Sequence, residues 1–169
     1  MNLYLLRHGI AAANDDPAFP FDAERPLTKK GIKRMRKAAR GISRLAITFD
    51  AILTSPLVRA RQTAEIVATA LAAESCLDEL LELAPGSSPD QLLSAFNGLK
   101  EHEHVMLVGH EPLLGEFAGF LLSTNNVADL AIPLKKGGIC CVEVDFPATG
   151  KPGHLHWLLT PKQLRLIAR

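Results

Sequence analysis

Three short apolar runs, each followed by a helix-like segment, constrain the fold of this chain more than any other feature. The runs are Leu3–Leu6, Ala51–Leu53 and Val105–Val108, which are long enough for buried strands and too short for helices. Polar residues end each run, and apolar residues at helical spacing follow. Alternating strands and helices form mostly parallel sheets with helices on both faces. The sequence therefore predicts an α/β sandwich.

Capping residues indicate where three of the helices begin. Thr28 is a suitable N-cap for a helix running to about residue 46. Ser55 and Pro56 suit the N-cap and first position of a second helix, which fades near residue 74. Residues 88–91 (Ser-Pro-Asp-Gln) resemble a capping box that opens a helix to about residue 100. A further helical pattern covers residues 113–121.

The remaining strands are predicted after these helices. Residues 76–83 have room for a short strand, and residues 138–146 and 155–159 predict two more. Proline and glycine residues between the last two indicate a hairpin, which gives the sheet an antiparallel edge strand. We find no repeat or linker, so residues 1–169 are predicted to form a single domain.

Composition excludes several classes of protein. With 47% hydrophobic and 22% charged residues, the chain is expected to be soluble and globular. No apolar stretch is long enough for a bilayer and no leader pattern opens the chain, which predicts a cytoplasmic protein without membrane contact. The three cysteines lack metal-binding spacing, so reduced thiols are expected.

Cationic side chains stand at the ends of the predicted strands. Arg7 and His8 end the first run, Arg59 follows the second in the first turn of a helix, and His110 follows the third. The carboxyl ends of parallel strands meet at one edge of a sheet, so we expect these groups to converge. Guanidinium groups match phosphate oxygens in bidentate fashion, and together with two imidazoles they suit a tetrahedral anion.

Four motifs in these positions resemble those of the histidine phosphatase superfamily, which includes phosphoglycerate mutases and many phosphatases. They are Leu6–Gly9 (LRHG), residues 55–64 (SPLVRARQTA), Gly109–Pro112 (GHEP) and Arg25–Thr28 (RPLT). The RPLT segment, followed by Gly31, resembles a motif of the SixA-type phosphohistidine phosphatase branch. The resemblance spans nearly the whole chain, and it implies a three-layer α/β/α sandwich of the phosphoglycerate mutase type.

The resemblance also implies a role for each matching residue. His8 corresponds to the nucleophile that becomes phosphohistidine, and Arg7, Arg59 and His110 correspond to residues that bind the phosphoryl oxygens. Arg25 corresponds to a fourth phosphoryl contact; the alternative for Arg25 is a surface ion pair with Glu24 or Asp22. Nearby arginines disfavour imidazolium and so keep a histidine nucleophilic. The same cations stabilise charge on the transferring phosphoryl group, so no metal or other cofactor is expected.

The proton donor to the leaving group stays open. Many family members use a carboxylate after a later strand, and Glu82 and Glu79 lie in that region of the sequence. The SixA-type branch does not reliably carry this carboxylate, so neither residue is assigned. A phosphohistidine substrate needs less help than an ester, because its P–N bond breaks easily once the imidazole is protonated.

The preferred substrate is therefore phosphohistidine on a partner protein. Two alternatives remain: a phosphatase or mutase acting on a small phosphate ester, and a phosphate-binding module without turnover. The cations between Lys29 and Arg44 are interpreted as a solvated helix face, with docking of an acidic partner left open. Nucleic acid is not expected as a partner, because aromatic residues make up only 5% and none lies among these cations.

Overall fold

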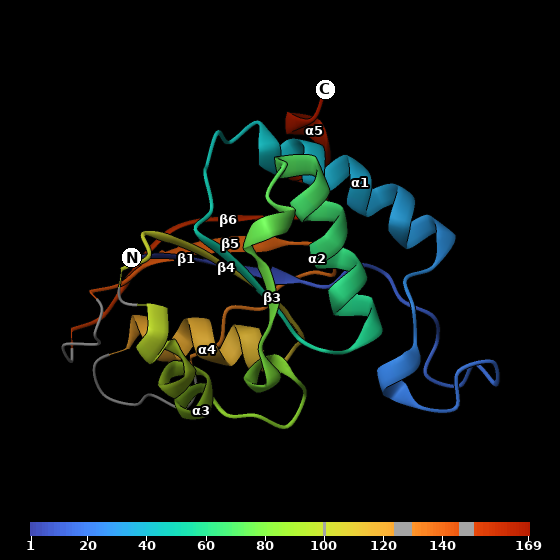
Figure 1. Cartoon of the computed structure of the whole chain (residues 1–169), viewed down its shortest axis with the longest axis horizontal. Coiled ribbons are helices and arrows are strands. Elements are labelled where there is room, and N and C mark those ends of the chain that lie inside the picture. Colours follow the sequence, from blue (N-terminus) through green and yellow to red (C-terminus); the bar gives the residue numbers. More distant parts are fainter. Residues whose placement is uncertain (100, 124–129, 146–150) are drawn as a thin grey trace.

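A six-stranded sheet forms the centre of the computed structural model, which describes residues 1–99, 101–123, 130–145 and 151–169 (Figure 1). The spatial order of the strands is β3-β2-β4-β1-β5-β6. Their bounds are β1 Asn2–Arg7, β2 Ala51–Thr54, β3 Leu77–Glu79, β4 His104–Gly109, β5 Ile139–Glu143 and β6 His154–Leu159.

The sheet has a parallel side and an antiparallel side. β1 pairs in parallel with β4, β4 with β2, and β2 with β3. β5 is antiparallel to β1, and the edge strand β6 is antiparallel to β5. The predicted mixed sheet with a C-terminal hairpin is confirmed. The hydrogen-bonded register places Arg7 opposite Gly109, so the ends of β1 and β4 lie side by side.

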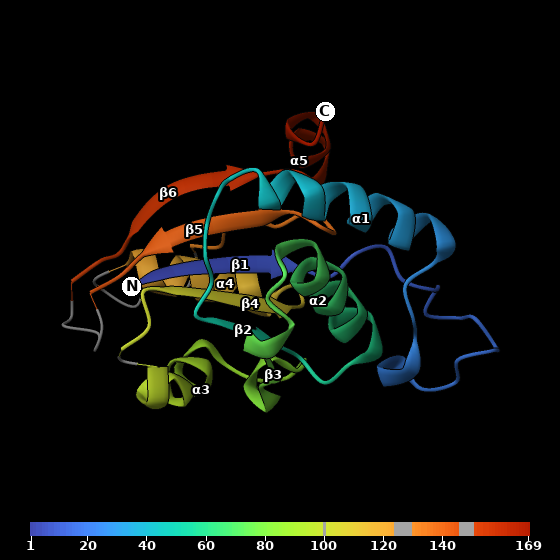
Figure 2. The ribbon, with the colours of Figure 1, turned by 45° about the horizontal axis from the view of Figure 1, so that its top comes forward.

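Helices cover both faces of the sheet, which gives three layers (Figure 2). One face carries α1, α2 and α5, and the other carries α3 and α4. Their bounds are α1 Lys29–Ser43, α2 Val58–Leu71, α3 Pro89–Ser94, α4 Leu113–Leu122 and α5 Pro161–Ile167. Short 3₁₀ turns occur at η1 Asp22–Glu24, η2 Glu74–Cys76, η3 Leu81–Leu83 and η4 Ala95–Leu99. None of the helices in these ranges is long and apolar enough to cross a membrane.

The residues of β1 alternate between two hydrophobic cores. Leu3 and Leu5 face α3 and α4, where they join a cluster that contains Phe117. Tyr4 and Leu6 face α1, α2 and α5. All four strand residues are at most 4% exposed, so the strand is fixed from both sides. Burial of each such side chain stabilises the fold by about 1.5–3 kcal/mol, and this holds the end of β1 rigidly in place.

Two of the three predicted caps are confirmed. The Thr28 hydroxyl accepts a hydrogen bond from the Gly31 N–H at 2.9 Å, and Ser88 forms a capping box with Gln91. The prediction for Ser55 is wrong, because α2 begins at Val58 and its N-cap residue makes no side-chain hydrogen bond. Ser55 instead accepts from the Leu57 N–H and contacts a histidine, as described below.

The C-terminal helix α5 was not predicted. Its N-cap, Thr160, forms a capping box with Gln163, and Pro161 occupies the first turn. The Thr-Pro-x-Gln pattern is a recognisable start signal, but the helix is only seven residues long and has little periodicity. Leu164 is fully buried and ties α5 to α1, where any side chain on Gly41 would collide with the Leu164 carbonyl group.

Candidate active site

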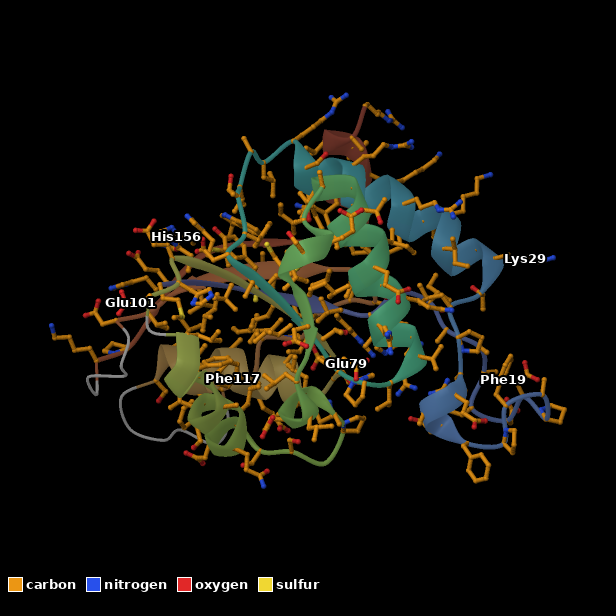
Figure 3. The ribbon with its side chains drawn as sticks, viewed as in Figure 1. Phe19, Lys29, Glu79, Glu101, Phe117 and His156 are labelled. Atoms are coloured by element: carbon orange, nitrogen blue, oxygen red, sulfur yellow. The ribbon has the colours of Figure 1, made fainter. Side chains whose placement is uncertain are left out.

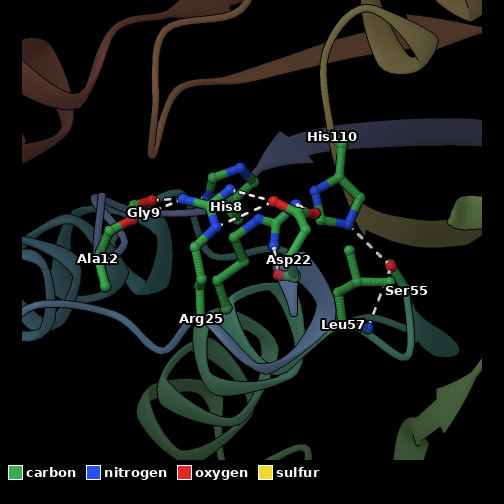
Figure 4. A network of polar contacts seen from close by, with 9 residues as sticks. His8, Gly9, Ala12, Asp22, Arg25, Ser55, Leu57 and His110 are labelled. Atoms are coloured by element: carbon green, nitrogen blue, oxygen red, sulfur yellow. Dashed lines mark hydrogen bonds and ion pairs between the residues drawn. The ribbon is translucent and has the colours of Figure 1, made fainter. Parts of the chain in front are cut away.

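The side chains at the strand ends converge as predicted: His8 and His110 lie close together (Figure 4), and Arg59 and Arg7 are near enough to act electrostatically on His8. His8 follows β1 and His110 follows β4, and the backbone N–H of His8 donates to the Gly109 carbonyl at 3.0 Å. The centroids of the two imidazole rings are 5.1 Å apart. Arg59, in the first turn of α2, and Arg7, at the end of β1, complete what we call the strand-end cluster: Arg7, His8, Arg59 and His110.

His8 is held in one tautomer. Its Nδ1 lies 2.7 Å from the Gly9 carbonyl oxygen, which only accepts hydrogen bonds, so Nδ1 carries the proton. In the neutral ring, Nε2 therefore keeps its lone pair. The residue is 6% exposed, and burial together with the charges of Arg59 and Arg7 lowers the pKa of His8 to about 4, despite the opposing hydrogen bond to Gly9. His8 is thus a neutral imidazole at neutral pH.

His110 is oriented by Ser55, which is fully buried. The Ser55 Oγ lies 2.8 Å from His110 Nε2 and accepts from the Leu57 N–H at 3.3 Å. When the hydroxyl donates to Nε2, the ring proton sits on Nδ1, which is buried and has no partner among the described residues. Burial and the neighbouring His8 and Arg59 lower the pKa of His110 to about 3.

The turn that precedes β5 fixes Arg7. Its Nη1 donates to the Leu134 carbonyl at 2.8 Å, while the Leu134 N–H donates to Glu111 Oε1 at 2.7 Å. The Gly137 N–H donates to the carbonyl groups of both Arg7 and His8 at 3.0 Å. Gly137 has a φ of 76°, which glycine adopts without strain.

Arg59 is almost entirely buried, with 4% exposure. Its Nη1 donates to the main-chain oxygen of Asp22 at 2.7 Å, and its Nη2 donates to the Asp22 carboxylate at 2.8 Å. The Arg59 carbonyl accepts from the Thr63 hydroxyl, which in turn accepts from the Gly9 N–H at 3.0 Å. This chain of hydrogen bonds ties the first turn of α2 to the loop after His8.

Arg25 and Asp22 sit together beside Arg59 of the strand-end cluster. Arg25 donates through Nε to Asp22 Oδ1 at 2.9 Å and also pairs with it through Nη2. Partial burial alone would raise the pKa of Asp22, but the hydrogen bonds from Arg25 and Arg59 lower it. The two interpretations of Arg25 are therefore compatible, because its ion-pair partner also contacts Arg59.

Sequence reasoning missed the position of Asp22. The sequence offers Asp22 only as one of two possible surface partners of Arg25, whereas in the structure its carboxylate also pairs with Arg59, the most buried arginine of the cluster. Figure 4 shows Asp22 between Arg25 and His110. The charge of Asp22 also acts on His110. The spacing of three residues between Asp22 and Arg25 does indicate that these two side chains can pair. The direction of the Asp22 carboxylate toward Arg59 depends on the path of the loop.

Neither glutamate considered as a proton donor contacts the cluster. Glu79, labelled in Figure 3, forms an ion pair of 2.7 Å with Arg61. Glu82 lies on η3 and lines a surface hollow with Ser87 and Asp90. Within the described residues, no hydrogen bond or ion pair connects either glutamate to the strand-end cluster. Both therefore stay unassigned.

Three buried N–H groups or ring nitrogens in this cluster lack a hydrogen-bond partner. They are Arg7 Nε, Arg59 Nε and His110 Nδ1, and they make up three of the four such atoms in the described part of the chain. An unsatisfied buried polar group costs about 1–3 kcal/mol, so their concentration at one place points to a ligand that accepts hydrogen bonds. A tetrahedral oxyanion matches both their number and their charge.

Comparison with known proteins agrees with this geometry. Residues 3–88, about half of the chain, match the model of the histidine phosphatase superfamily (branch 1). A protein of Picosynechococcus sp. (strain ATCC 27264 / PCC 7002 / PR-6) is 44% identical over 130 residues, which cover 70% of this chain and 71% of that protein.

Two further matches point to one branch of the superfamily. The phosphohistidine phosphatase SixA of Escherichia coli (strain K12) is 28% identical over 169 residues, which cover 98% of each chain. A structure of the protein histidine phosphatase SixA complexed with tungstate superposes with a TM-score of 0.82 at 26% identity, covering 97% of this chain and 99% of that one. The fold, the strand-end cluster and these matches together establish that the chain belongs to the histidine phosphatase superfamily, in its SixA-type branch.

Proposed function

We propose that this phosphatase works through a phosphohistidine formed on His8 and removes phosphate from phosphohistidine on a partner protein. The observation that carries the proposal is the state of His8. The Nδ1–H of His8 donates to the Gly9 carbonyl, and the pKa of His8 is lowered to about 4. The charges of Arg59 and Arg7 act on the same ring. A neutral imidazole with a free Nε2 beside guanidinium groups is suited to attack phosphorus.

The first step transfers the phosphoryl group to the protein. The Nε2 lone pair of His8 forms a bond to phosphorus while the bond between phosphorus and the leaving group breaks in line. Arg7 and Arg59 donate hydrogen bonds to the phosphoryl oxygens, and His110 donates from Nδ1. These fixed donors stabilise the charge that develops on the oxygens, and they need no rearrangement at that moment.

The second step returns His8 to its starting state. A water molecule attacks phosphorus on the side opposite Nε2, the N–P bond breaks, and orthophosphate is released with one proton passing to solvent. The electron pair of the broken bond returns to Nε2. Because Nδ1 keeps its hydrogen bond to Gly9 throughout, the ring is ready for another turnover without changing tautomer.

Neither Glu79 nor Glu82 contacts the strand-end cluster, and a phosphohistidine substrate fits a site without either of these two proton donors. Protonation of the substrate imidazole makes it a good leaving group before the P–N bond breaks, whereas an alkoxide needs a positioned acid. The SixA relatives support the same substrate class. We also place the activity in the cytoplasm, where protein phosphohistidine would meet the enzyme.

A substrate panel tests this proposal. The purified chain is offered a phosphohistidine-bearing protein domain, free small phosphate esters and a phosphoglycerate. We expect the highest kcat/KM with the phosphohistidine domain and no phosphate release from any of them by His8→Ala. A preference for small esters would support the alternative substrate class. Binding of orthophosphate without turnover of any compound would identify a phosphate-binding module and contradict the proposal.

A further inference from the structure

A small hollow lies between α1, α5 and the turn before β5, on the side of the sheet that α1 and α5 cover (Figure 2). Its volume is about 40 Å³. One water molecule needs roughly 10–15 Å³ of such space, so the hollow has room for about three groups of that size. Met35, Ala38 and Pro161 give it an apolar wall, and no member of the strand-end cluster lines it. The hollow is therefore separate from the candidate active site.

Three cations from three chain segments line this hollow. Arg34 comes from α1, Lys136 from the turn before β5, and Arg165 from α5. No acidic residue lines the hollow, and none of these three cations forms an ion pair within the described ranges. Cations gathered around one space repel each other, and a bound anion removes that repulsion. The arrangement is therefore suited to a small anion.

The backbone around the hollow leaves recognition to these side chains. Gly9, Gly31 and Gly137 line it without side chains of their own. Their N–H groups already donate elsewhere, the first two to threonine hydroxyls and Gly137 to the carbonyl groups of Arg7 and His8. The ligand is then held by guanidinium and ammonium groups that approach it from three sides. A tetrahedral oxyanion offers acceptors in several directions at once and suits such donors.

We propose that the hollow is a second anion site, which binds one free oxyanion of the size of orthophosphate. The volume supports a single oxyanionic group and leaves no space for a nucleotide. Arg34 and Lys136 are exposed, so an ion can enter from solvent, whereas Arg165 is half-buried and forms the inner contact. This site goes beyond the proposed phosphatase function and does not depend on it.

The hollow shares its walls with the backbone that holds His8. The Gly9 carbonyl accepts from His8 Nδ1 at 2.7 Å, and the Gly137 N–H donates to the His8 carbonyl at 3.0 Å. Burial is the largest cause of the lowered pKa of His8, and the charge of Lys136 lowers this pKa further. An anion beside Lys136 offsets that charge, so an occupied hollow is expected to raise the pKa of His8.

Binding is tested by titrating orthophosphate into the ¹⁵N-labelled chain at low salt. The backbone amide signals of Ala38 and Lys136 report on the hollow, and that of His110 reports on the strand-end cluster. Arg165→Gln should weaken binding at the hollow by about 5–10-fold, because one charged donor is lost, and leave binding at the cluster unchanged. Lys162→Gln is the matched control, since this exposed residue of α5 does not line the hollow.

Three results would overturn the site. The first is a titration without saturable shifts at Ala38 and Lys136. The second is equal weakening by Lys162→Gln, which would reduce the site to diffuse surface charge. The third is binding of glycerol phosphate in the hollow without binding of orthophosphate, which would contradict a free ion as the ligand.

Sulfate tests the link to His8, because it stays a dianion through the pH range in which His8 titrates. NMR should show that sulfate raises the pKa of His8 less in Arg165→Gln than in the wild type, since the hollow then stays empty while the strand-end cluster still fills. An equal rise in both would overturn the link. Neither titration needs turnover, so a chain that hydrolyses no phosphate compound would contradict the proposed function and leave the test of this site intact.

Discussion

Two groups of cations in this molecule differ in whether the fold buries them or leaves them in solvent. The strand-end cluster contains four side chains from three separate chain segments, of which His8, Arg59 and His110 are at most 6% exposed. The basic face of α1 is larger but belongs to one helix. Its members are all exposed: Lys29, Lys30, Lys33, Arg34, Arg36, Lys37, Arg40 and Arg44. Lys29 extends away from the first turn of α1 in Figure 3.

The difference shows that burial and convergence, rather than the number of charges, make a site. Water screens the cations of α1, and none of them forms an ion pair within the described residues. In the cluster, burial is the main cause of the lowered pKa values of both histidines, and the neighbouring cationic groups lower them further. Burying cations lowers the stability of the fold, and a site that does so is expected to bind an oxyanion tightly.

The largest difference between the two groups is expected when one cation is removed from each and kcat/KM is compared. Arg59→Met removes a buried phosphoryl contact, so kcat/KM should fall by roughly 10²–10³-fold, the usual effect of losing a donor to a developing oxyanion. Arg34→Gln, on the exposed face of α1, should change kcat/KM for a small ester by less than about twofold. Circular dichroism melts check that both variants fold. Similar losses in the two variants would contradict the distinction.

The titration of His8 tests the electrostatic side of the comparison. NMR of labelled histidine should show the wild-type His8 ring taking up a proton near pH 4, far below the ordinary value of 6.5. Because a depressed pKa means that the neutral form persists as pH falls, His8 stays unprotonated through the range in which an ordinary histidine becomes charged. Arg59→Met should raise this pKa, though not to 6.5, because burial remains the largest cause. Titration of wild-type His8 near pH 6.5 would contradict the described environment.

The contact between Ser55 and His110 gives a smaller expected effect. Ser55→Ala removes the partner of His110 Nε2 and releases the constraint on the tautomer. One neutral hydrogen bond contributes about 0.5–1.5 kcal/mol, so kcat should fall by roughly 3–10-fold. Thr54→Ser, which keeps the neighbouring hydroxyl, serves as the control. An unchanged rate and an unchanged NMR tautomer signal for His110 would show that Ser55 is not needed.

The smallest effect is expected on the basic face of α1. The combined variant Lys33→Gln, Arg34→Gln, Lys37→Gln should retain kcat/KM for small esters to within about twofold, because these side chains are exposed. A phosphoprotein with an acidic surface gives a sharper comparison. A loss confined to that substrate, and strongest at low salt, would show that the basic face has a docking role after all.

The sequence was most informative where local pattern decides structure. Leu3–Leu6 and Val105–Val108 are apolar runs whose ends must meet if their strands are parallel neighbours, so the convergence of His8 and His110 could be predicted. The hydroxyl of Ser55 could not be placed in the same way. It satisfies the rules for an N-cap, and only the tertiary approach of His110 determines that it is used elsewhere.

Asp22 shows a second limit of sequence reasoning. Residues 12–21 belong to no helix or strand, and Asp22 itself lies in a 3₁₀ turn of only three residues, so no local periodic pattern predicts the direction of its side chain. Its contact with Arg59 joins residues 37 positions apart. Sequence can supply the list of charged residues in such a loop, but the contacts come from the path of the backbone.

The most direct test of a phosphohistidine on His8 is to trap it. The chain is mixed with a ³²P-labelled phosphohistidine domain, quenched in alkali within milliseconds and digested, and the labelled peptide is sequenced by mass spectrometry. We predict acid-labile, alkali-stable label on the peptide that contains His8, and no label in His8→Ala, with Arg34→Gln labelled like the wild type. Label that persists in His8→Ala, or that maps to His110, would contradict the assignment of His8 as the nucleophile.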